Sequence, residues 1–404
     1  MKEFVKTEEN DGLTRVFKYR LFPTSKQVTL LNSMLVDHCS LYNSALEDTI
    51  TAWNTSQKNV TYYDQSKQLK GTRLANPEGL GRWSFSSEQQ TLRRLHIARA
   101  AFFRRIKAGE TPGSPRYKPI SRFSTVSFIN GDGGKWNESI KRVYILGIGH
   151  VKVNLHRATK GIAKQFSITR EGKHWFVNVI CVKIPKETRK PTGSIIGIDV
   201  GVTNLLADSN GNLYENPRHT RNNTGGLAKA QQELSRCVKG STRWGKAKQK
   251  IANIHRNTVN QRRDNLHKLS HKLILENDFI VMEALKIPNM VKRAKPKKNS
   301  DGTYAPNGGA AKTGLNRVIH DAGWGLLRTM TLYKAENAGI EVILVTPEYS
   351  SQECYECEFV DPGNRNDEQF KCLSCGHRDH ADVNASKVLL RRGLRLRENC
   401  LTAT

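Results

Sequence analysis

Two closely spaced pairs of cysteines near the C-terminal end restrict the fold of this chain more than any other feature. They follow the pattern Cys-x2-Cys-x14-Cys-x2-Cys and are Cys354, Cys357, Cys372 and Cys375. Two such pairs of thiolates can close a tetrahedral zinc site, and the metal then stabilises a segment whose own core is too small to fold alone. Since four sulfurs leave no open coordination position, we expect a structural zinc ribbon over residues 349–377 and any catalysis elsewhere.

Disulfide pairing is the alternative for these four thiols. The chain has eight cysteines in 404 residues, too few for a disulfide scaffold, and the paired spacing favours a metal in a reducing compartment. His377 and His380 lie close by and could replace a ligand, but four thiolates suffice. The other cysteines have no such neighbours and are expected to be packed or surface thiols: Cys39, Cys181, Cys237 and Cys400.

The charge balance points to a polyanionic partner. The chain carries 65 lysines and arginines against 37 acidic residues, a net charge of +28. Nucleic acid is the partner that this charge favours, although ribosomal or membrane-surface binding would also fit it. No long apolar run is present and the N-terminus is polar, so we expect neither a membrane span nor a signal peptide, and a cytoplasmic protein that acts on the nucleoid. The length suggests roughly two to four compact units.

The N-terminal part combines a strand with helices. Residues 14–22 alternate as in a strand, and Pro23, Thr24 and Ser25 mark the start of an amphipathic helix. His38 falls on the apolar stripe of that helix and is expected to be a core histidine.

A second amphipathic helix is predicted from about Gln89 to Lys107. Its apolar face is expected to consist of Leu92, Leu95, Ala98, Phe102 and Ile106. Its outer face is expected to consist of Arg93, Arg94, Arg99, Arg104 and Arg105. This outer face fits a track for phosphate groups as well as it fits an ordinary solvated surface.

The character of the chain changes after this helix. Residues 108–119 contain the prolines and glycines that break a helix, and residues 123–184 favour strands. In the segment 174–184 both alternating faces are apolar, so we expect a strand buried on both sides.

The next segment supplies a hairpin and a basic helical stretch. Residues 194–214 contain two apolar strands separated by the turn signal Asn210-Gly211. Residues 218–272 are strongly basic with a helical composition, which predicts a long pair of helices.

A strand, a loop and a helix follow. Residues 278–285 predict a short apolar strand, and residues 316–338 predict a helix that leads to the strand 341–347. Between them, residues 286–314 are rich in lysine, glycine and proline and predict a mobile basic loop.

Three acidic residues stand out in this basic chain because regular elements present them. Asp199 ends a predicted strand, Glu283 ends another, and Asp382 opens a predicted helix. Taken singly, each could be a helix cap or a solvated charge. Converging carboxylates, however, are what phosphodiester hydrolysis by two hard metal ions requires.

The order of these motifs resembles the split RuvC nuclease domain of the TnpB family and of its descendants, the type V CRISPR effectors. The segment GIDVGVTNLLADSNG is similar to the first motif of the family, VMEAL to the second, and HRDHADVNASKVLL to the third. The segments HDAGWG, PEYSSQ and FFRRIKAGETPGSPRYK add to the resemblance. It implies a catalytic triad of Asp199, Glu283 and Asp382, and Asp-x-Asn-Ala favours Asp382 over the nearby Asp379.

The resemblance also implies a multidomain α/β architecture. A wedge-like β-barrel, split over residues 1–24 and 112–190, would enclose a helical recognition domain, residues 25–111. An RNase H-like (RuvC) nuclease domain, residues 191–348 and 378–404, would carry the zinc ribbon as an insert that binds target nucleic acid. Two features depart from the family: a longer loop after Glu283 and a short C-terminal tail.

The partners implied are a transposon-derived guide RNA and double-stranded target DNA with a short flanking motif, with one protein monomer per guide. Magnesium, in two sites, would be the catalytic metal. Polar groups suited to base edges, and arginines suited to phosphates, are expected to contact nucleic acid: Gln89, Gln90, Arg93, Arg104, Arg105, Ser127 and Asn130.

Two other functions remain open at this point. The chain could be a nucleic-acid-binding regulator that has lost its chemistry, although all three carboxylates are present. It could also be a guide-free nuclease for branched DNA, which would need neither the helical block nor the ribbon.

Overall fold

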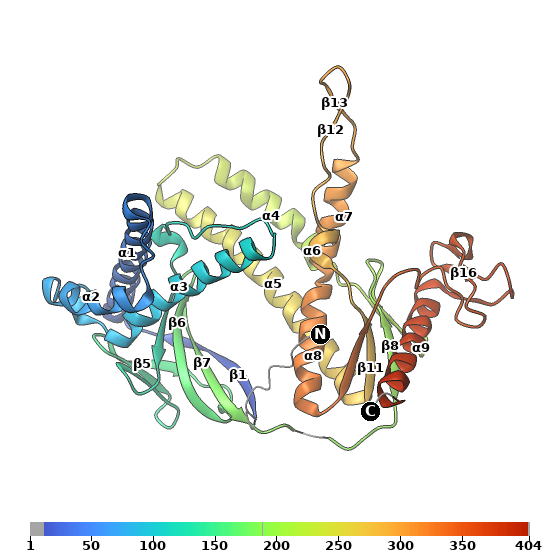
Figure 1. The fold of residues 1–404 in the computed structure, drawn as a ribbon, viewed down its shortest axis with the longest axis horizontal. Coiled ribbons are helices and arrows are strands. Elements are labelled where there is room, and N and C mark those ends of the chain that lie inside the picture. Colours follow the sequence, from blue (N-terminus) through green and yellow to red (C-terminus); the bar gives the residue numbers. More distant parts are fainter. Residues whose placement is uncertain (1–11, 188, 403–404) are drawn as a thin grey trace. The chain divides into compact units, whose positions relative to one another are not determined.

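The computed structural model describes residues 12–187 and 189–402. The chain divides into two compact units, Met1–Pro185 and Lys186–Thr404 (Figure 1). None of the helices in the described residues combines the length and the apolar character that crossing a membrane requires.

The first unit contains a seven-stranded antiparallel sheet with the order β2-β6-β7-β1-β5-β4-β3. Its strands are β1 Leu13–Phe22, β2 Thr125–Ile129, β3 Gly134–Asn137, β4 Arg142–Ile145, β5 Gly149–Asn154, β6 Ile162–Glu171 and β7 His174–Ile184. β1 pairs with β5 and β7, so the predicted N-terminal strand joins the sheet formed by the later strands. The prediction that β7 is buried on both faces is wrong, because Trp175, Val177 and Val179 are buried while Phe176 and Asn178, which alternate with them, are only half-buried.

Helices of the first unit lie between β1 and β2 in the chain. They are α1 Ser25–Ser56, α2 Tyr62–Ala75 and α3 Phe85–Lys107, with short 3-10 turns at Leu80–Arg82 and Ile120–Arg122. Thr24 and Gln27 form a capping box at the start of α1, which satisfies two backbone donors and fixes the helix start where the sequence predicts it. His38 is fully buried, and its ring nitrogens lie 2.8 Å from the Thr91 hydroxyl and 3.3 Å from the Ser87 hydroxyl, as expected of a core histidine.

The predicted faces of α3 need three corrections. Arg99, expected on the outer face, is half-buried and its guanidinium donates to the Val60 carbonyl at 3.0 Å. Ile106 is 47% exposed, in a last turn whose residues 103–107 are all exposed. Arg94 does not point into solvent: its guanidinium donates to the Thr125 carbonyl at 3.0 Å and lies over the ring of Phe123. A long arginine side chain can bury its stem and stack on an aromatic ring, and a simple amphipathic pattern does not anticipate this.

The second unit is built on a five-stranded sheet with the order β10-β9-β8-β11-β14. Its strands are β8 Ile195–Asp199, β9 Asn204–Asp208, β10 Leu213–Glu215, β11 Phe279–Glu283 and β14 Glu341–Val345. The first three form an antiparallel meander, whereas β8, β11 and β14 are parallel. Parallel neighbours end at the same edge, so this sheet brings the ends of β8 and β11 together.

The helices of this unit are α4 His219–Ser235, α5 Thr242–Glu276, α6 Ile287–Met290, α7 Gly309–Ala322, α8 Trp324–Ala338 and α9 Ala381–Thr402. α9 packs against β8, β9, β11 and β14 (Figure 1). Its close approach depends on Gly197 in β8, because a Cβ there would lie 2.1 Å from the carbonyl oxygen of Ser386. This contact fixes where α9, and therefore its first turn, meets the sheet.

Two predictions about residues 286–338 are corrected by the structure. The loop after β11 contains α6 and a small hairpin, β12 Lys297–Lys298 and β13 Tyr304–Ala305, which lies at the tip of an arm supported by α7 (Figure 1). The helix predicted over 316–338 is two helices, because Gly323 adopts a left-handed conformation with φ 72° and caps the end of α7.

The cysteine-rich segment forms a three-stranded antiparallel sheet. Its strands are β15 Arg365–Asn366, β16 Gln369–Lys371 and β17 Arg378–His380, with a 3-10 turn at Pro362–Asn364. β17 follows the last cysteine and leads directly into α9, so the ribbon is joined without a linker to the helix that carries Asp382.

Candidate active site

The three acidic residues singled out in the sequence are presented at one edge of the five-stranded sheet. Asp199 is the last residue of β8, Glu283 is the last residue of β11, and Asp382 is the second residue of α9. Ile198 pairs with Met282 in the parallel register. The next residues in the two strands, Asp199 and Glu283, are therefore neighbours at the strand ends. The packing of α9 against β8 brings Asp382 to them.

Burial and mutual repulsion shift the pKa values of two of the three carboxyl groups. Burial raises the pKa of Asp199 well above its usual range, and the negative charges of Glu283 and Asp382 raise it further. Burial also raises the pKa of Glu283 to about 7, although a hydrogen bond from Ser350 and the charge of Arg392 oppose the rise. Three mutually repelling carboxyl groups in a partly desolvated place favour the binding of a cation.

Asp382 is paired with an arginine that the sequence did not single out. Arg365, on β15, lies with its Nη2 2.8 Å from Oδ1 of Asp382. The three carboxylates do not form a compact group of ligand atoms like that of the ribbon: among the described residues, the four cysteines are the only group of three or more His, Cys, Asp or Glu side chains placed to hold one ion. No local pattern marks Arg365, because only the fold of the ribbon brings it to Asp382.

A polar cleft of about 880 Å³ opens beside Asp382 within the second unit. Its walls come from the turn after β8, from the ribbon and from the first turn of α9. It is lined by Thr203, Ser351, Gln352, Pro362, Arg365, Asn366, Asp367, Glu368, Gln369 and Asp382. The carboxylate of Asp382 and the guanidinium of Arg365 are therefore accessible to a ligand in this cleft.

The four cysteines of the ribbon form the cluster that their spacing predicts. Their Sγ atoms all lie within 4.8 Å of one another, with 3.7 Å between Cys354 and Cys375 and 3.5 Å between Cys357 and Cys372. Tetrahedral zinc with Zn–S bonds of ~2.3 Å requires sulfur separations of ~3.8 Å, so these positions fit the ion.

The knuckle amides favour a thiolate at one of these positions. Although burial raises the pKa of Cys372, backbone N–H groups of Cys375 and Ser374 lower it to about 7. His377 and His380, the possible substitutes, are not members of the cluster. His380 instead accepts a hydrogen bond from the backbone N–H of Asp382 at 3.2 Å.

In the first unit, the residues proposed to contact nucleic acid differ in their availability. Gln89 and Gln90 are half-buried on α3, and Gln89 donates to the Ser66 hydroxyl at 3.0 Å. Both ends of the Asn130 side-chain amide are used within the sheet: its Nδ2 donates to the Ala163 carbonyl and its Oδ1 accepts from the backbone N–H of Trp136, each at 2.9 Å. Ser127 is half-buried on β2, opposite Ser167.

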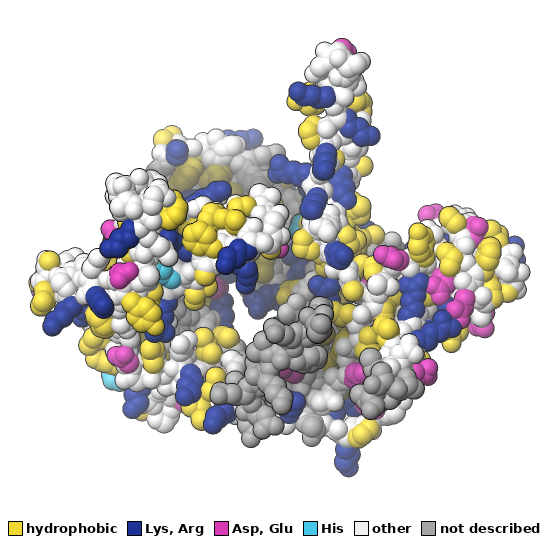
Figure 2. All heavy atoms as spheres, viewed as in Figure 1, with side chains coloured by type: hydrophobic (Ala, Val, Ile, Leu, Met, Phe, Trp, Pro, Cys, Tyr) yellow, Lys and Arg dark blue, Asp and Glu magenta, His cyan; other side chains and the backbone are white. Residues whose placement is uncertain are grey.

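The arginines proposed to contact phosphates are more exposed than these polar residues. Arg104 and Arg105 are exposed on the last turn of α3, and Arg93 is exposed with its guanidinium over the ring of Tyr62 at 5.1 Å. Lysine and arginine side chains are spread over both units and along the arm that ends in β12 and β13 (Figure 2).

Comparisons with known proteins agree on one family. The family described as "Probable transposase" matches residues 179–294, and the "Cas12f1-like, TNB domain" matches residues 324–389. A family described as "Helix-turn-helix domain" matches residues 13–58, which this structure folds as strand β1 followed by the single helix α1.

Two relatives match over most of their length. A Streptomyces pristinaespiralis protein named as an RNA-guided DNA endonuclease is 32% identical, over 94% of this chain and 89% of its own. The Escherichia coli K12 protein InsQ, with the same designation, is 30% identical, over 94% of this chain and 92% of its own. A solved structure of a Cas12f1-sgRNA-target DNA complex covers 94% of this chain with a TM-score of 0.54 at 11% identity, and so shares its fold.

Proposed function

The chain belongs to the TnpB family of RNA-guided DNA endonucleases, and from this membership we propose how it acts. It pairs a transposon-derived guide RNA with target DNA next to a short flanking motif, and it hydrolyses phosphodiester bonds at Asp199, Glu283 and Asp382. The observation that carries the assignment of the site is the convergence of three carboxylates from separate elements, at the ends of β8 and β11 and in the first turn of α9. The raised pKa of Asp199, to which the other two carboxylates contribute, agrees with it.

The topology of the second unit supports a RuvC, RNase H-like assignment. An antiparallel meander continued by parallel strands, with acidic residues at the ends of β8 and β11 and a third on α9, is the arrangement expected from the family resemblance. The domain limits given above for the split barrel, the recognition helices, the nuclease domain and the ribbon belong to the same proposal.

Asp199, Glu283 and Asp382 would hold the catalytic metal, two magnesium ions. Magnesium supplies activation of water and stabilisation of the leaving oxygen in such sites, and hard oxygen ligands suit it. Arg365 lies on the cleft beside Asp382 and can bind either that carboxylate or a phosphate oxygen of the substrate. The cysteine cluster would hold a structural zinc that fixes the ribbon around the cleft.

Guide RNA and DNA would be held through their phosphates by the excess of basic side chains, with Arg93, Arg104 and Arg105 among the contacts. The flanking motif would be read from the first unit. Gln89 and Gln90 are the first candidates because the Asn130 amide is occupied within the sheet, and Ser127 is the remaining one.

Alanine at Gln89 is expected to change the motif preference in a randomised-flank cleavage library, by about 1–3 kcal/mol for a base contacted directly. Alanine at Asn130 is expected to act mainly through the stability of the sheet. An unchanged preference in the Gln89 variant would remove that residue from motif reading.

The function as a whole is tested by purifying the protein at low salt with and without its adjacent RNA locus. We expect the protein to retain RNA, and Mg²⁺-dependent cleavage to follow the guide sequence. Cleavage without RNA would indicate the guide-free nuclease, and guide-directed binding without cleavage in Mg²⁺ would indicate the regulator.

A further inference from the structure

Ser350 connects the zinc ribbon to the acidic site. It lies in the segment 346–353, here called the entry segment, which joins β14 to the first cysteine pair. Its side chain is nearly fully buried, and its hydroxyl lies 3.1 Å from Oε1 of Glu283 and 3.1 Å from the carbonyl oxygen of Pro347.

The hydroxyl has one hydrogen and two possible acceptors. The carbonyl of Pro347 already accepts the backbone N–H of Ser350 at 3.3 Å, whereas a hydrogen bond to a carboxylate is the stronger one. The Ser350 hydroxyl therefore donates its hydrogen bond to Glu283, and this bond fixes the rotation of the carboxylate at the end of β11.

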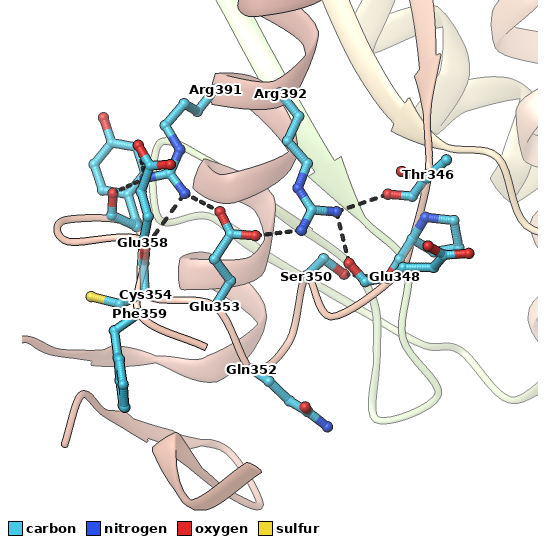
Figure 3. Close-up of polar contacts among 12 residues, drawn as sticks. Thr346, Glu348, Ser350, Gln352, Glu353, Cys354, Glu358, Phe359, Arg391 and Arg392 are labelled. Carbon is cyan, nitrogen blue, oxygen red and sulfur yellow. Dashed lines mark hydrogen bonds and ion pairs between the residues drawn. The ribbon is translucent and has the colours of Figure 1, made fainter. Parts of the chain in front are cut away.

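Hydrogen bonds and ion pairs from two arginines of α9 hold the entry segment in place (Figure 3). Arg392 donates to the carbonyl oxygens of Thr346 at 3.0 Å and Glu348 at 2.8 Å, on the N-terminal side of Ser350. On the other side, the buried carboxylate of Glu353 pairs with both Arg391 and Arg392. The serine is thus held between two attachments to one helix.

The same helix carries Asp382 in its first turn, so the network connects the elements that present two carboxylates of the site. Arg391 also donates to the carbonyl of Cys354 at 3.5 Å, and so reaches the first zinc-binding cysteine. A displacement of the entry segment would move the Ser350 hydroxyl relative to Glu283 while leaving the β11 backbone in its sheet.

From these contacts we propose that Ser350 is a positioning residue for Glu283, and that the Glu353–Arg391–Arg392 network sets the position of Ser350. This deepens the proposed function and rests on it. The serine orients a metal-binding carboxylate and does not touch the substrate. Partners of this kind typically change metal affinity or activity roughly 10- to 100-fold when they are removed.

The first test uses Ser350→Ala in the full chain with its guide. Ser235→Ala is the control for the loss of a serine hydroxyl, because the Ser235 hydroxyl donates to the backbone oxygen of Gln232, three residues earlier, at 2.8 Å, but lies at the end of α4 and has no carboxylate as its acceptor. We expect Ser350→Ala to raise the half-saturating Mg²⁺ concentration for cleavage roughly tenfold or more, and Ser235→Ala to leave it unchanged.

Mn²⁺ affinity of the protein–guide complex without target, measured by electron paramagnetic resonance, gives a readout independent of cleavage. We expect it to weaken in Ser350→Ala, with zinc content and melting temperature at wild-type values. Unchanged Mn²⁺ affinity, or a weakening accompanied by loss of zinc, would overturn the proposal, since the serine would then be only structural. Absence of guide-directed cleavage by the wild type would instead overturn the proposed function, and the Mn²⁺ measurement would still decide the role of Ser350.

Glu353→Gln tests the network. If the network acts through Ser350, this change weakens Mn²⁺ binding in the wild-type background and has little further effect in Ser350→Ala. Additive effects of the two changes would show that the network does not act through the serine and would overturn that part of the proposal.

Discussion

The two proposed metal sites of the second unit differ in how closely their ligand atoms are already gathered. The cysteine ribbon gathers its four sulfurs from a stretch of 22 residues, Cys354–Cys375, at separations that fit a zinc ion. The acidic site draws its carboxylates from two strands and a helix, spread from Asp199 to Asp382, and one of them is paired with Arg365. Soft, nearly neutral thiols can share a small space without a metal, whereas clustered carboxylates repel one another.

The comparison predicts that damage to the two centres will have different consequences. Loss of a ligand at the acidic site should remove chemistry and spare the fold. Loss of a ligand at the ribbon should remove part of the fold and, through it, the chemistry.

The largest effect is expected for Asp382→Ala. Cleavage of both DNA strands should fall by more than the roughly 10- to 100-fold typical of outer-shell substitutions, whereas guide-directed DNA binding should persist because phosphate contacts and base pairing supply it. Strand-resolved cleavage beside a binding titration measures both. Asp379→Asn is the control, since Asp379 pairs with Lys387 at 2.7 Å and should keep most activity. Full cleavage by the Asp382 variant would remove that residue from the site.

The next largest effect is expected for Cys372→Ser. The variant should lose its zinc, approximately one ion per chain, and melt at a lower temperature, because the small core of the ribbon is built from Phe370 and Ala381 together with two of the cysteines. Cleavage should fall as well, because β17 joins the ribbon directly to α9 and Asp382. Metal analysis and thermal unfolding measure these effects, and Cys237→Ser, which changes an isolated thiol, should change neither. Zinc-free protein with full activity would contradict the prediction.

The contrast between the two centres also explains what the sequence could predict. The local spacing of the cysteines identifies the ligands of the ribbon, and the capping residues Thr24 and Gln27 mark the start of α1. The acidic residues were found because each ends or opens a regular element, although their assembly came from the family resemblance. These features depend on contacts between residues near in sequence, or on the strand and helix periods.

The partners of the acidic site could not be predicted in this way. Arg365, Ser350 and Arg392 reach the carboxylates only through the fold of the ribbon and the packing of α9, and arginine and serine are common on any surface. The same limit explains Arg94, whose stacking on Phe123 depends on a segment that lies beyond α3. The break at Gly323 had a local signal, but the apolar pattern continues through it and favoured one helix.

A smaller effect, which depends on pH, is expected at the acidic site alone. The pKa of Glu283 is raised to about 7 in the folded protein, mainly by burial, whereas an unfolded glutamate titrates near ~4.3. At pH values between these two pKa values the folded state therefore binds more protons than the unfolded state. The contribution of protonated Glu283 to folding stability is complete below the lower pKa and is lost as the pH rises to about 7. Above that pH the ionised carboxylates repel, and Mg²⁺ relieves the repulsion. The rise in melting temperature on adding Mg²⁺ should be larger at pH 8 than at pH 6, by roughly 2–4 °C for each kcal/mol of differential binding. Differential scanning calorimetry of zinc-saturated protein measures it, and Glu283→Gln should reduce the difference; an equal rise at both pH values would mean that Glu283 is not part of the magnesium site.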